Sequence, residues 1–310
     1  MKRAIIGVDA GGSSTKLALF LEDGTIVKKL KAKAGSSASV KSALENVEEG
    51  VYKLYEEVKN EYDLKAIVIG LSGLKANSKE SLEKLVSNLK AKTNLDVLLN
   101  PDTLIALYSH LKDEYEEGIV VISGTGHASF GLNKNGKSMM IGGWGYMIYE
   151  IGSAFSAVQD LIIKSVRHYE EEGKVYPLAQ SLIKAIGLST IDDLRVFMYH
   201  NDKKEIASYA YLITDGAKAG DRIALEILDD ASKGIARSIK LLVKHLELKE
   251  TAVLGFTGEY IKNSKILQEL VLEKLQKEKI KLKYLEGSID PIYGAYYLAR
   301  KKGKIWKLLV

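Results

Sequence analysis

The sequence predicts an α/β protein in which one strand-rich plan occurs twice. Near the N-terminus, three β-like runs are joined by the glycine-rich turn "DAGGSST" and by the hairpin dipeptide Asp23-Gly24. From Glu117 the order strand, glycine turn, strand, hairpin and strand begins again in "GIVVISGTGHASFGLNKNGKSMMIGG". After each start, helical and strand patterns follow one another, which is typical of an α/β layer around a mixed sheet. Such an internal repeat predicts two similar domains.

The first copy is expected to open with an antiparallel meander over residues 3–34. Apolar residues then recur at helical spacing over residues 40–62. A strand over 65–73, a helix that ends near Leu89 and a strand over 96–102 complete this half. The predicted N-terminal domain is residues 1–114, and the last helix of the chain, about 291–302, is a candidate to pack back on it.

The second copy, residues 115–290, is expected to carry most of the helices. No linker or low-complexity tract stands out, so the repeat itself sets the domain boundary. Its predicted helices cover 152–172, 177–186, 191–199, 204–217, 221–246 and 264–277, with strands over 251–258 and 279–286 and a final helix over 291–301.

Composition excludes several classes of function. The formal charge is +5, from 45 Lys and Arg against 40 Asp and Glu, and acids and bases alternate, so nucleic acid is not expected as a partner. No apolar run is long enough to cross a bilayer, so a membrane is not expected either. The chain has no cysteine, which excludes disulfides, iron–sulfur clusters and thiolate zinc sites. Its five histidines form no metal-binding pattern. Without a visible signal peptide, a cytoplasmic location is expected.

One motif matches by letters only. The run "GLNKNGKS" fits the P-loop template G-x-x-x-x-G-K-[ST]. A working P-loop needs its lysine at the start of a helix, whose N-terminus supplies the N–H donors. Here Asn135-Gly136 is the preferred dipeptide of a type I′ hairpin turn, and a strand-like run follows. We therefore interpret the match as chance.

The two glycine turns are the better candidates for binding phosphate. Their bare backbone N–H groups can approach an anion closely, and neighbouring hydroxyls add donors. The alternative is that both are only tight hairpins. The candidate residues are Gly11, Gly12 and Ser13 in the first turn, and Gly124, Thr125 and Gly126 in the second.

Two acidic residues follow predicted strands. Asp9 precedes the first glycine turn, where a carboxylate could hold Mg²⁺ directly or through water. Asp102 ends the strand "DVLLNPD" before a helix, so it is a candidate for the base that accepts a hydroxyl proton in phosphoryl transfer. An N-cap for that helix is the alternative role for Asp102.

At these residues the chain resembles a known family. The segments "GVDAGGSSTKLAL", "VVISGTG", "GGWGYMIYEIGSA", "GAKAGDRIAL" and "FTGEYIKNSKIL" are similar in order and spacing to those of N-acetylglucosamine kinases. These kinases and the BadF/BadG/BcrA/BcrD ATPase family belong to the sugar kinase, actin and Hsp70 superfamily. The resemblance covers nearly the whole chain. It implies two ribonuclease H-like (actin-like ATPase) domains around a central cleft, ATP and Mg²⁺ as cofactors, a sugar substrate and a homodimer.

The resemblance also implies roles for individual residues. Ser13 and Thr125 match positions that contact ATP phosphates, and Asp102 matches the sugar-binding aspartate that acts as base. Phosphorylation of an amino sugar or hexose is implied, at the 6-hydroxyl. Four further sets follow: nucleotide contacts at Gly216 and Gly258, a sugar loop at Gly143, Trp144 and Gly145, a sugar-hydroxyl contact at Glu150, and a sugar-site candidate at His127.

This chain departs from the family at the sugar loop. Where relatives read "GGWGHMMGDEGSA", it has Tyr149, Glu150 and Ile151 in place of glycine, aspartate and glutamate. An asparagine that the kinases place after the third strand is missing, and the segment "AGSSASV" offers only serines 36, 37 and 39. The choice among N-acetylglucosamine, glucosamine, N-acetylmuramic acid and glucose is therefore open.

Other members of the superfamily fit this sequence less well than the kinases. Activators of 2-hydroxyacyl-CoA dehydratases need cysteines for an iron–sulfur cluster, and this chain has none. The repressor, open reading frame and kinase (ROK) sugar kinases carry a cysteine-bearing zinc motif that is also missing. A catalytically idle sensor or scaffold that binds nucleotide or sugar is the alternative that stays open, because fold and activity can separate.

Overall fold

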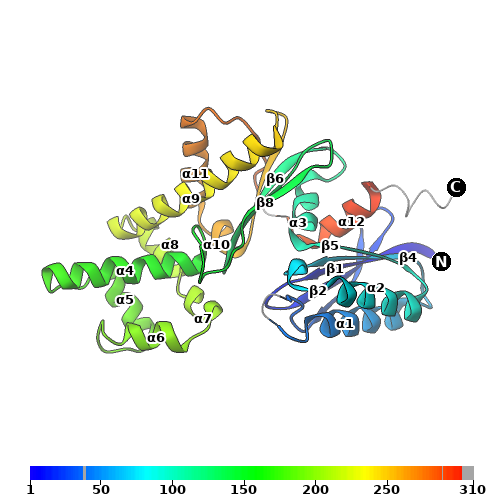
Figure 1. Cartoon of the computed structure of the whole chain (residues 1–310), viewed down its shortest axis with the longest axis horizontal. Helices are drawn as coiled ribbons and strands as arrows, with labels where there is room; N and C mark the ends of the chain where they lie inside the picture. The colour runs from blue at the N-terminus through cyan, green and yellow to red at the C-terminus, as the bar shows by residue number, and fades with distance from the viewer. Residues whose placement is uncertain (38–39, 288, 302–310) are drawn as a thin grey trace. The chain divides into compact units, whose positions relative to one another are not determined.

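The computed structural model describes residues 1–37, 40–287 and 289–301, which form two compact units (Figure 1). Unit 1 comprises Met1–Tyr115 together with the described C-terminal residues from Ile289. Unit 2 comprises the described residues from Glu116 to 287. Among the described helices, none is both long and apolar enough to cross a membrane.

Unit 1 is built on a five-stranded mixed sheet. The first three strands form an antiparallel meander, and two parallel strands extend it on the other side of the first strand, in the order β3-β2-β1-β4-β5. The predicted meander is therefore confirmed. The strands are β1 (Lys2–Ala10), β2 (Thr15–Leu21), β3 (Ile26–Ala32), β4 (Tyr62–Leu71) and β5 (Asp96–Pro101).

Helices cover both faces of this sheet, because alternate residues of β1 are buried on opposite sides. On one face, Ile6 and Val8 join a core with apolar residues of α1 (Ala43–Val58) and α2 (Lys79–Thr93). On the other face lie α3 (Asp102–Leu111) and α12 (Ile292–Lys301), as Figure 1 shows. There Phe20 of β2 stacks on Tyr296 of α12 with ring centroids 5.6 Å apart. A short 3₁₀ helix, Leu74–Ala76, follows β4.

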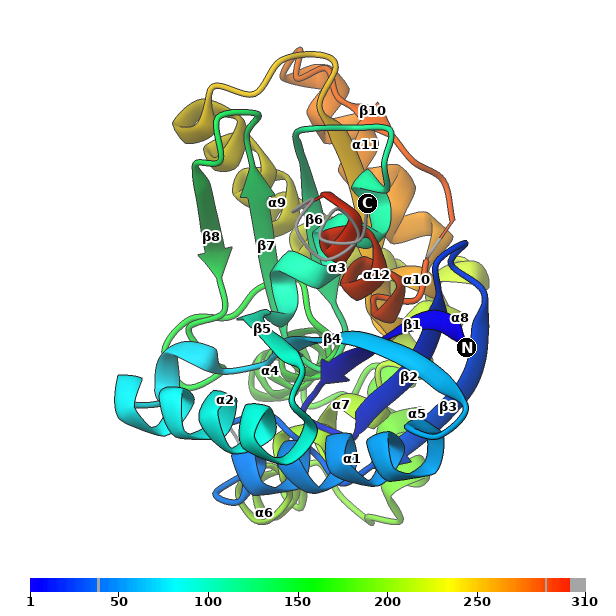
Figure 2. The same ribbon diagram turned by 90° about the vertical axis from the view of Figure 1, so that its right-hand side faces the viewer.

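Unit 2 repeats the plan of unit 1. Its sheet has the order β10-β9-β6-β7-β8, in which β6, β7 and β8 form the antiparallel meander and β9 and β10 are parallel to β6 (Figure 2). The same sheet order in both units confirms the internal repeat. The strands are β6 (Gly118–Ser123), β7 (His127–Leu132), β8 (Ser138–Gly142), β9 (Val253–Thr257) and β10 (Lys283–Tyr284).

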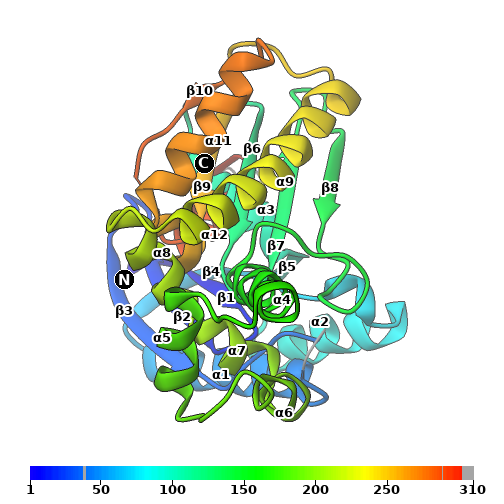
Figure 3. The ribbon, with the colours of Figure 1, turned by 90° about the vertical axis from the view of Figure 1, so that its left-hand side faces the viewer.

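The helices of unit 2 make a larger core than those of unit 1. Figure 3 shows the long helix α9 beside α11 along the sheet, with α4 to α8 beyond its end. Apolar residues recur along α9 at helical spacing, among them Ile227, Ala231 and Ile235, which are all buried. The helices are α4 (Ala154–Glu172), α5 (Pro177–Ile186), α6 (Leu194–His200), α7 (Lys203–Ser208), α8 (Tyr211–Lys218), α9 (Arg222–Leu246), α10 (Glu259–Lys262) and α11 (Lys265–Lys277).

Two sequence expectations for unit 2 are wrong. The single helix predicted over 204–217 is divided into α7 and α8, because the chain tightens between them into i→i+3 hydrogen bonds such as Ala210 N–H to Ala207 O. Apolar residues on both sides of this break are buried, so both short helices still pack into the core. The strand predicted over 279–286 pairs with β9 only at Lys283 and Tyr284.

The hairpins of the two meanders have the same hydrogen bonds. In the first, Leu21 N–H donates to Thr25 O, and Gly24 N–H donates to Leu21 O. In the second, Asn133 and Gly136 occupy the equivalent positions. In each loop, only the glycine has a positive φ, which is the pattern of a type I turn followed by a bulge. A type I′ turn would need a positive φ at Asn135 as well, so the prediction of that turn type is wrong. The Asn133 side chain stabilises the observed turn, because its Oδ1 accepts hydrogen bonds from two backbone N–H groups of the loop.

We predict that buried His110 makes unit 1 acid-sensitive. Both of its ring nitrogens are buried without a partner among the described residues, and burial, with a smaller effect of Lys112, lowers its pKa from 6.5 to about 4. The unfolded chain takes up this proton below pH 6.5, whereas the folded chain does so only near pH 4. The free energy of unfolding therefore falls with decreasing pH in this window, by about 1.4 kcal/mol per pH unit for one such group.

Urea denaturation at several pH values checks this expectation. His110→Phe is expected to lower the slope of stability against pH between pH 6 and pH 4.5 by about 1 kcal/mol per unit. His200→Phe, at an exposed position, serves as the control and should keep the wild-type slope. Equal slopes in all three proteins would contradict the role of His110.

Candidate active site

In unit 1, the glycine turn and both predicted acids lie at one edge of the sheet. Strands β1, β4 and β5 run parallel, and their register aligns Asp9 with Gly70 and Gly70 with Asn100. The carboxyl ends of the three strands therefore meet, which is where open α/β sheets usually bind ligands. Asp102 follows β5 directly at this edge.

The first glycine turn is closed by its own backbone. Gly11 N–H donates to Ser14 O over 3.1 Å, and Gly35 N–H donates to Gly11 O. In the described part of the chain, the N–H groups of Gly12 and Ser13 donate to no protein acceptor, and both residues are exposed. The turn thus presents two free backbone donors and one hydroxyl to an anion.

Asp9 lies in a cluster of charged groups. Burial raises the pKa of its carboxyl to about 6, the cross-strand neighbour Lys16 opposes this shift, and Asp102 and Asp290 add to it. Lys16 Nζ also lies 3.4 Å from Asp290 Oδ1. Sequence reasoning missed both residues. The hairpin register opposite Asp9 could have identified Lys16, whereas nothing local connects Asp290 with this edge.

Asp102 is held by two hydrogen bonds. Its Oδ1 accepts the Thr103 N–H over 2.8 Å, and the Ser72 hydroxyl donates to the carboxylate. Burial raises the pKa of Asp102, and these two donors oppose the shift. The N-cap of α3 is Pro101, so the N-cap role considered for Asp102 is wrong.

The segment that lacks the asparagine of the family pattern carries serines in this part of unit 1. Ser36 is buried, and its Oγ donates to Ser72 Oγ over 3.2 Å, so it reaches Asp102 through Ser72. The Ser37 hydroxyl is buried without a partner among the described residues. Ser39, the third serine of the segment, lies outside the described residues. The network restrains Ser72, and through it the carboxylate of Asp102.

In unit 2, the second glycine turn connects β6 to β7 in the same way. Gly124 N–H donates to Gly126 O over 3.0 Å, and Ala154 N–H at the start of α4 donates to Gly124 O over 2.9 Å. Thr125 is exposed, and among the described residues no acceptor receives its N–H or that of Gly126. This turn therefore also presents free donors.

Gly258 packs against the backbone of that turn. Its φ is +97°, and a Cβ at this position would lie 2.5 Å from the Ser123 carbonyl oxygen. Only glycine lets the chain after β9 approach so closely. Gly216, the other predicted nucleotide contact, lies in α8 against Leu178 and Ala224, where helices pack.

The predicted sugar loop follows β8. Gly143 and Gly145 have φ values of +74° and +89°, so both positions need glycine, and Gly143 N–H donates to His127 O over 3.0 Å. Trp144 is 68% exposed. Ile151, where the family pattern has a glutamate, packs against Gly234 of α9, where a Cβ would lie 2.3 Å from it. The departure at 151 thus serves packing inside unit 2.

Glu150 and His127 both have partners inside the protein. Glu150 pairs with Lys203 over 2.6 Å and accepts the Ser153 hydroxyl over 2.5 Å. The buried His127 ring contacts Ser129 Oγ over 3.2 Å and the Ile151 backbone, and burial lowers its pKa to about 4, so it is neutral near pH 7. Contacts of either residue with a sugar stay predictions.

The comparison with protein families decides the assignment. Residues 6–299, which include both glycine turns, match the BadF/BadG/BcrA/BcrD ATPase family. The chain belongs to this family. The family resemblance predicted from the sequence is thereby confirmed.

Relatives of this BadF/BadG/BcrA/BcrD family member match along its whole length. An N-acetylmuramic acid/N-acetylglucosamine kinase of Clostridium acetobutylicum is 28% identical over 308 residues, 96% of this chain and 98% of the relative. An N-acetyl-D-glucosamine kinase of Dictyostelium discoideum is 26% identical over 318 residues, 98% of this chain and 99% of the relative.

The fold of this family member also occurs in solved structures. A ROK family glucokinase from Streptomyces griseus, solved with glucose and AMPPNP, has a TM-score of 0.63 at 14% identity and covers 96% of this chain and 99% of its own. Together with the two equivalent sheets, this likeness confirms the predicted α/β class of actin-like ATPase units.

The P-loop match of this family member lies in a hairpin, as expected. Lys137 precedes β8, and its Nζ donates to the His245 carbonyl over 2.9 Å. We predict that Lys137→Ala leaves nucleotide affinity and turnover unchanged within about twofold and costs at most about 1 kcal/mol of stability, the usual contribution of one hydrogen bond. Calorimetric titration with ADP checks the affinity, with Lys134→Ala of the same hairpin as the control. Loss of ADP binding in Lys137→Ala alone would restore the P-loop hypothesis.

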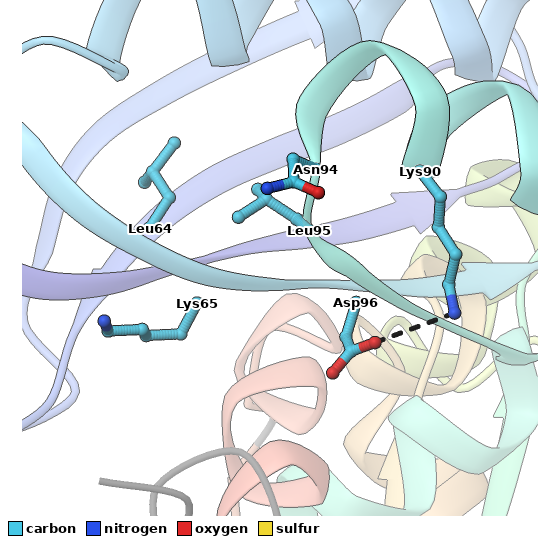
Figure 4. A pocket seen from close by; sticks show the side chains of 6 residues that line it. All are labelled: Leu64, Lys65, Lys90, Asn94, Leu95 and Asp96. Atoms are coloured by element: carbon cyan, nitrogen blue, oxygen red, sulfur yellow. Dashed lines mark ion pairs between the residues drawn. The ribbon is translucent and has the colours of Figure 1, made fainter.

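One surface hollow of unit 1 lies apart from these residues. Figure 4 shows it between β4, the end of α2 and the start of β5, with the Lys90–Asp96 ion pair of 3.6 Å beside it. None of the predicted site residues lines this hollow. It therefore does not belong to the candidate active site.

Proposed function

We propose that the protein is an ATP-dependent sugar kinase that phosphorylates an amino sugar or a hexose at its 6-hydroxyl. The names of both relatives, a kinase of N-acetylmuramic acid and N-acetylglucosamine and a kinase of N-acetylglucosamine, support this proposal. The observation that carries it is Asp102, a half-buried carboxylate with a raised pKa that Ser72 and Thr103 restrain beside Asp9. A restrained carboxylate of raised pKa is suited to accept a proton from a substrate hydroxyl.

In the proposed reaction, Asp102 accepts the proton of the 6-hydroxyl while the sugar oxygen forms a bond to the γ-phosphorus. The bond between that phosphorus and the bridging oxygen breaks, and ADP leaves with the electron pair. The products are a sugar phosphate, ADP and the proton taken by Asp102. The free N–H groups and hydroxyls at Ser13 and Thr125 bind the phosphates, since positioning and charge neutralisation supply most of the catalysis in this reaction.

Asp9 fits a Mg²⁺ ion bound through few protein oxygens. Partial burial raises the pKa of its carboxyl to about 6, and the neighbouring carboxylates of Asp102 and Asp290 add to the shift, so a bound cation would stabilise the ionised form. The described residues hold no group of three or more His, Asp or Glu suited to a metal, so water would supply the other ligands, as Mg²⁺ commonly prefers. When bound, Mg²⁺ would neutralise phosphate charge.

The remaining predicted residues have roles in this proposal. Gly258 and Gly216 contact the nucleoside side of ATP. The sugar lies against the loop of Gly143, Trp144 and Gly145, where the exposed indole offers a flat apolar surface to a sugar ring. The enzyme acts as a homodimer in the cytoplasm, where ATP is available, and size-exclusion chromatography with light scattering tests the dimer.

A coupled assay of ADP release over N-acetylglucosamine, glucosamine, N-acetylmuramic acid and glucose tests the activity. The kinase proposal expects turnover that depends on one or more of these sugars, together with a sugar 6-phosphate detected by ³¹P NMR. The alternative, an idle sensor or scaffold, expects binding of nucleotide or sugar without ADP release at any sugar concentration. Product formation therefore separates the two proposals.

A further inference from the structure

A lysine outside the predicted site lies against the second glycine turn. Lys203 is the first residue of α7, and its Nζ is 2.9 Å from the position that a Cβ on Gly126 would take. Both residues belong to unit 2. The ammonium group therefore lies next to the backbone that presents the free N–H groups of Thr125 and Gly126.

Several side chains of unit 2 fix the place of this ammonium. Glu150 Oε2 lies 2.6 Å from Nζ, and the other oxygen of the same carboxylate accepts the Ser153 hydroxyl at the start of α4. Nζ also lies 5.5 Å from the ring centre of Tyr146 and 5.9 Å from that of Phe155, within the range of cation–π attraction. A lysine restrained in this way loses little side-chain freedom when it binds an anion.

The ion pair leaves donor capacity on the lysine. An ammonium group has three N–H donors. In the described part of the chain, the Lys203 ammonium donates one hydrogen bond, to Glu150. The Glu150 side chain is only 4% exposed, whereas that of Lys203 is 24% exposed. Of the two side chains, that of the lysine is therefore the more accessible to solvent.

The identity of residue 126 agrees with this arrangement. Gly126 does not have a positive φ, so its backbone conformation does not require glycine. A Cβ would meet Lys203 Nζ at 2.9 Å and the Glu150 carboxylate oxygens at 3.6 Å. Glycine at 126 thus leaves room for the ammonium beside the turn, in contrast to Gly258, where both backbone conformation and backbone contact require it.

We propose that Lys203 binds the phosphate tail of the nucleotide at the Gly124–Gly126 turn, with Glu150 as its positioning residue. The inference rests on the proposed function, which places phosphate at this turn. A lysine beside free backbone N–H groups is a recurrent arrangement for binding phosphate, in which it acts as a compact positive charge. Glu150, expected from the family pattern to contact the sugar, then orients the lysine.

Affinity for AMP-PNP with Mg²⁺, measured by calorimetry without sugar, tests this assignment. Lys203→Met is expected to weaken affinity at least about tenfold, the effect of one charge-assisted contact. Lys203→Arg should restore part of it, and Lys204→Met, an exposed neighbour in the same helix, should bind like the wild type. Glu150→Gln should bind at least as tightly as the wild type, because the amide oxygen can still accept a hydrogen bond that orients the lysine, whereas the negative charge that competes with phosphate is lost.

A purely structural ion pair would give a different pattern. Lys203→Met and Glu150→Gln would then lower the melting temperature by similar amounts and leave AMP-PNP affinity unchanged, which would overturn the proposal. A rise in KM confined to N-acetylmuramic acid, which carries a carboxylate, with wild-type KM for ATP, would assign the lysine to the sugar and also overturn it. A wild type that binds AMP-PNP but releases no ADP with any sugar would reject the kinase proposal and leave the binding comparison valid.

Discussion

Replacing Asp102 by asparagine is expected to lower sugar-dependent turnover by at least about a hundredfold, the contribution of a general base in the transition state. The amide cannot accept the hydroxyl proton, yet it keeps the size of the side chain and can still accept the Thr103 N–H. Affinity for AMP-PNP should therefore stay within about twofold of the wild type, since the change acts on the chemical step.

The pH dependence of kcat gives a second measurement. Burial raises the pKa of Asp102, and the base must be ionised to accept a proton. The wild type is thus expected to lose activity on acidification at a pH above the ordinary range of an aspartate. This acidic limb should be missing from the residual activity of Asp102→Asn.

Asp96→Asn supplies the matched control for this variant. Asp96 begins the same strand, β5, is exposed, and its side chain forms an ion pair with Lys90 at 3.6 Å. An exposed pair of this kind contributes little, so activity and stability should resemble those of the wild type. Near-normal kcat in Asp102→Asn, with a melting temperature like that of Asp96→Asn, would remove Asp102 from the role of base.

Gly294→Ala is expected to produce the largest loss of stability. Gly294 lies where α12 crosses α3, and a Cβ there would fall 1.6 Å from the Ile105 carbonyl oxygen and 2.9 Å from the Ser109 nitrogen. The obstacle is helix backbone, so no rotamer change relieves it and the two helices must separate. The contact between Phe20 and Tyr296 beneath them would loosen as well. We expect a loss of more than about 3 kcal/mol, the upper range for overpacking a core.

Urea denaturation of the full chain measures this loss. Gly216→Ala is the matched control, because Gly216 also lies within a helix but its nearest neighbours are the side chains of Leu178 and Ala224 at 3.1 and 3.3 Å. Its gain in helix propensity, about 1 kcal/mol, should offset the tight contact. A midpoint for Gly294→Ala equal to that of the wild type would show that α12 does not pack on α3 as described.

Much of each unit is predictable because the signals are local. Strand alternation, the Asp23-Gly24 turn and the glycine turns follow from backbone geometry and from which side chains are buried, so the amino-acid pattern is enough to recognise the repeated meander. The rejection of the P-loop is equally local, since Lys137 lies in a hairpin. By contrast, the turn type at Asn135 was missed because the Asn133 side chain competes for the loop N–H groups.

Packing decided what local patterns could not. The chain breaks between α7 and α8 although residues 204–217 contain no helix-breaking proline. Ile151 could be expected at the sugar loop from its place in the motif, but it packs on Gly234. For Ile151, a neighbour distant in sequence determines where the side chain packs.

The sequence by itself determined the repeated plan, the positions of both glycine turns, and Asp9 and Asp102 at the ends of strands. Only the tertiary structure brought Lys16 and Asp290 to Asp9, Ser36 and Ser72 to Asp102, and Lys203 to Glu150. The physical reason is range. Backbone conformation and periodic burial act between near neighbours in sequence, whereas the environment of a charged group depends on side chains that folding brings together from distant segments.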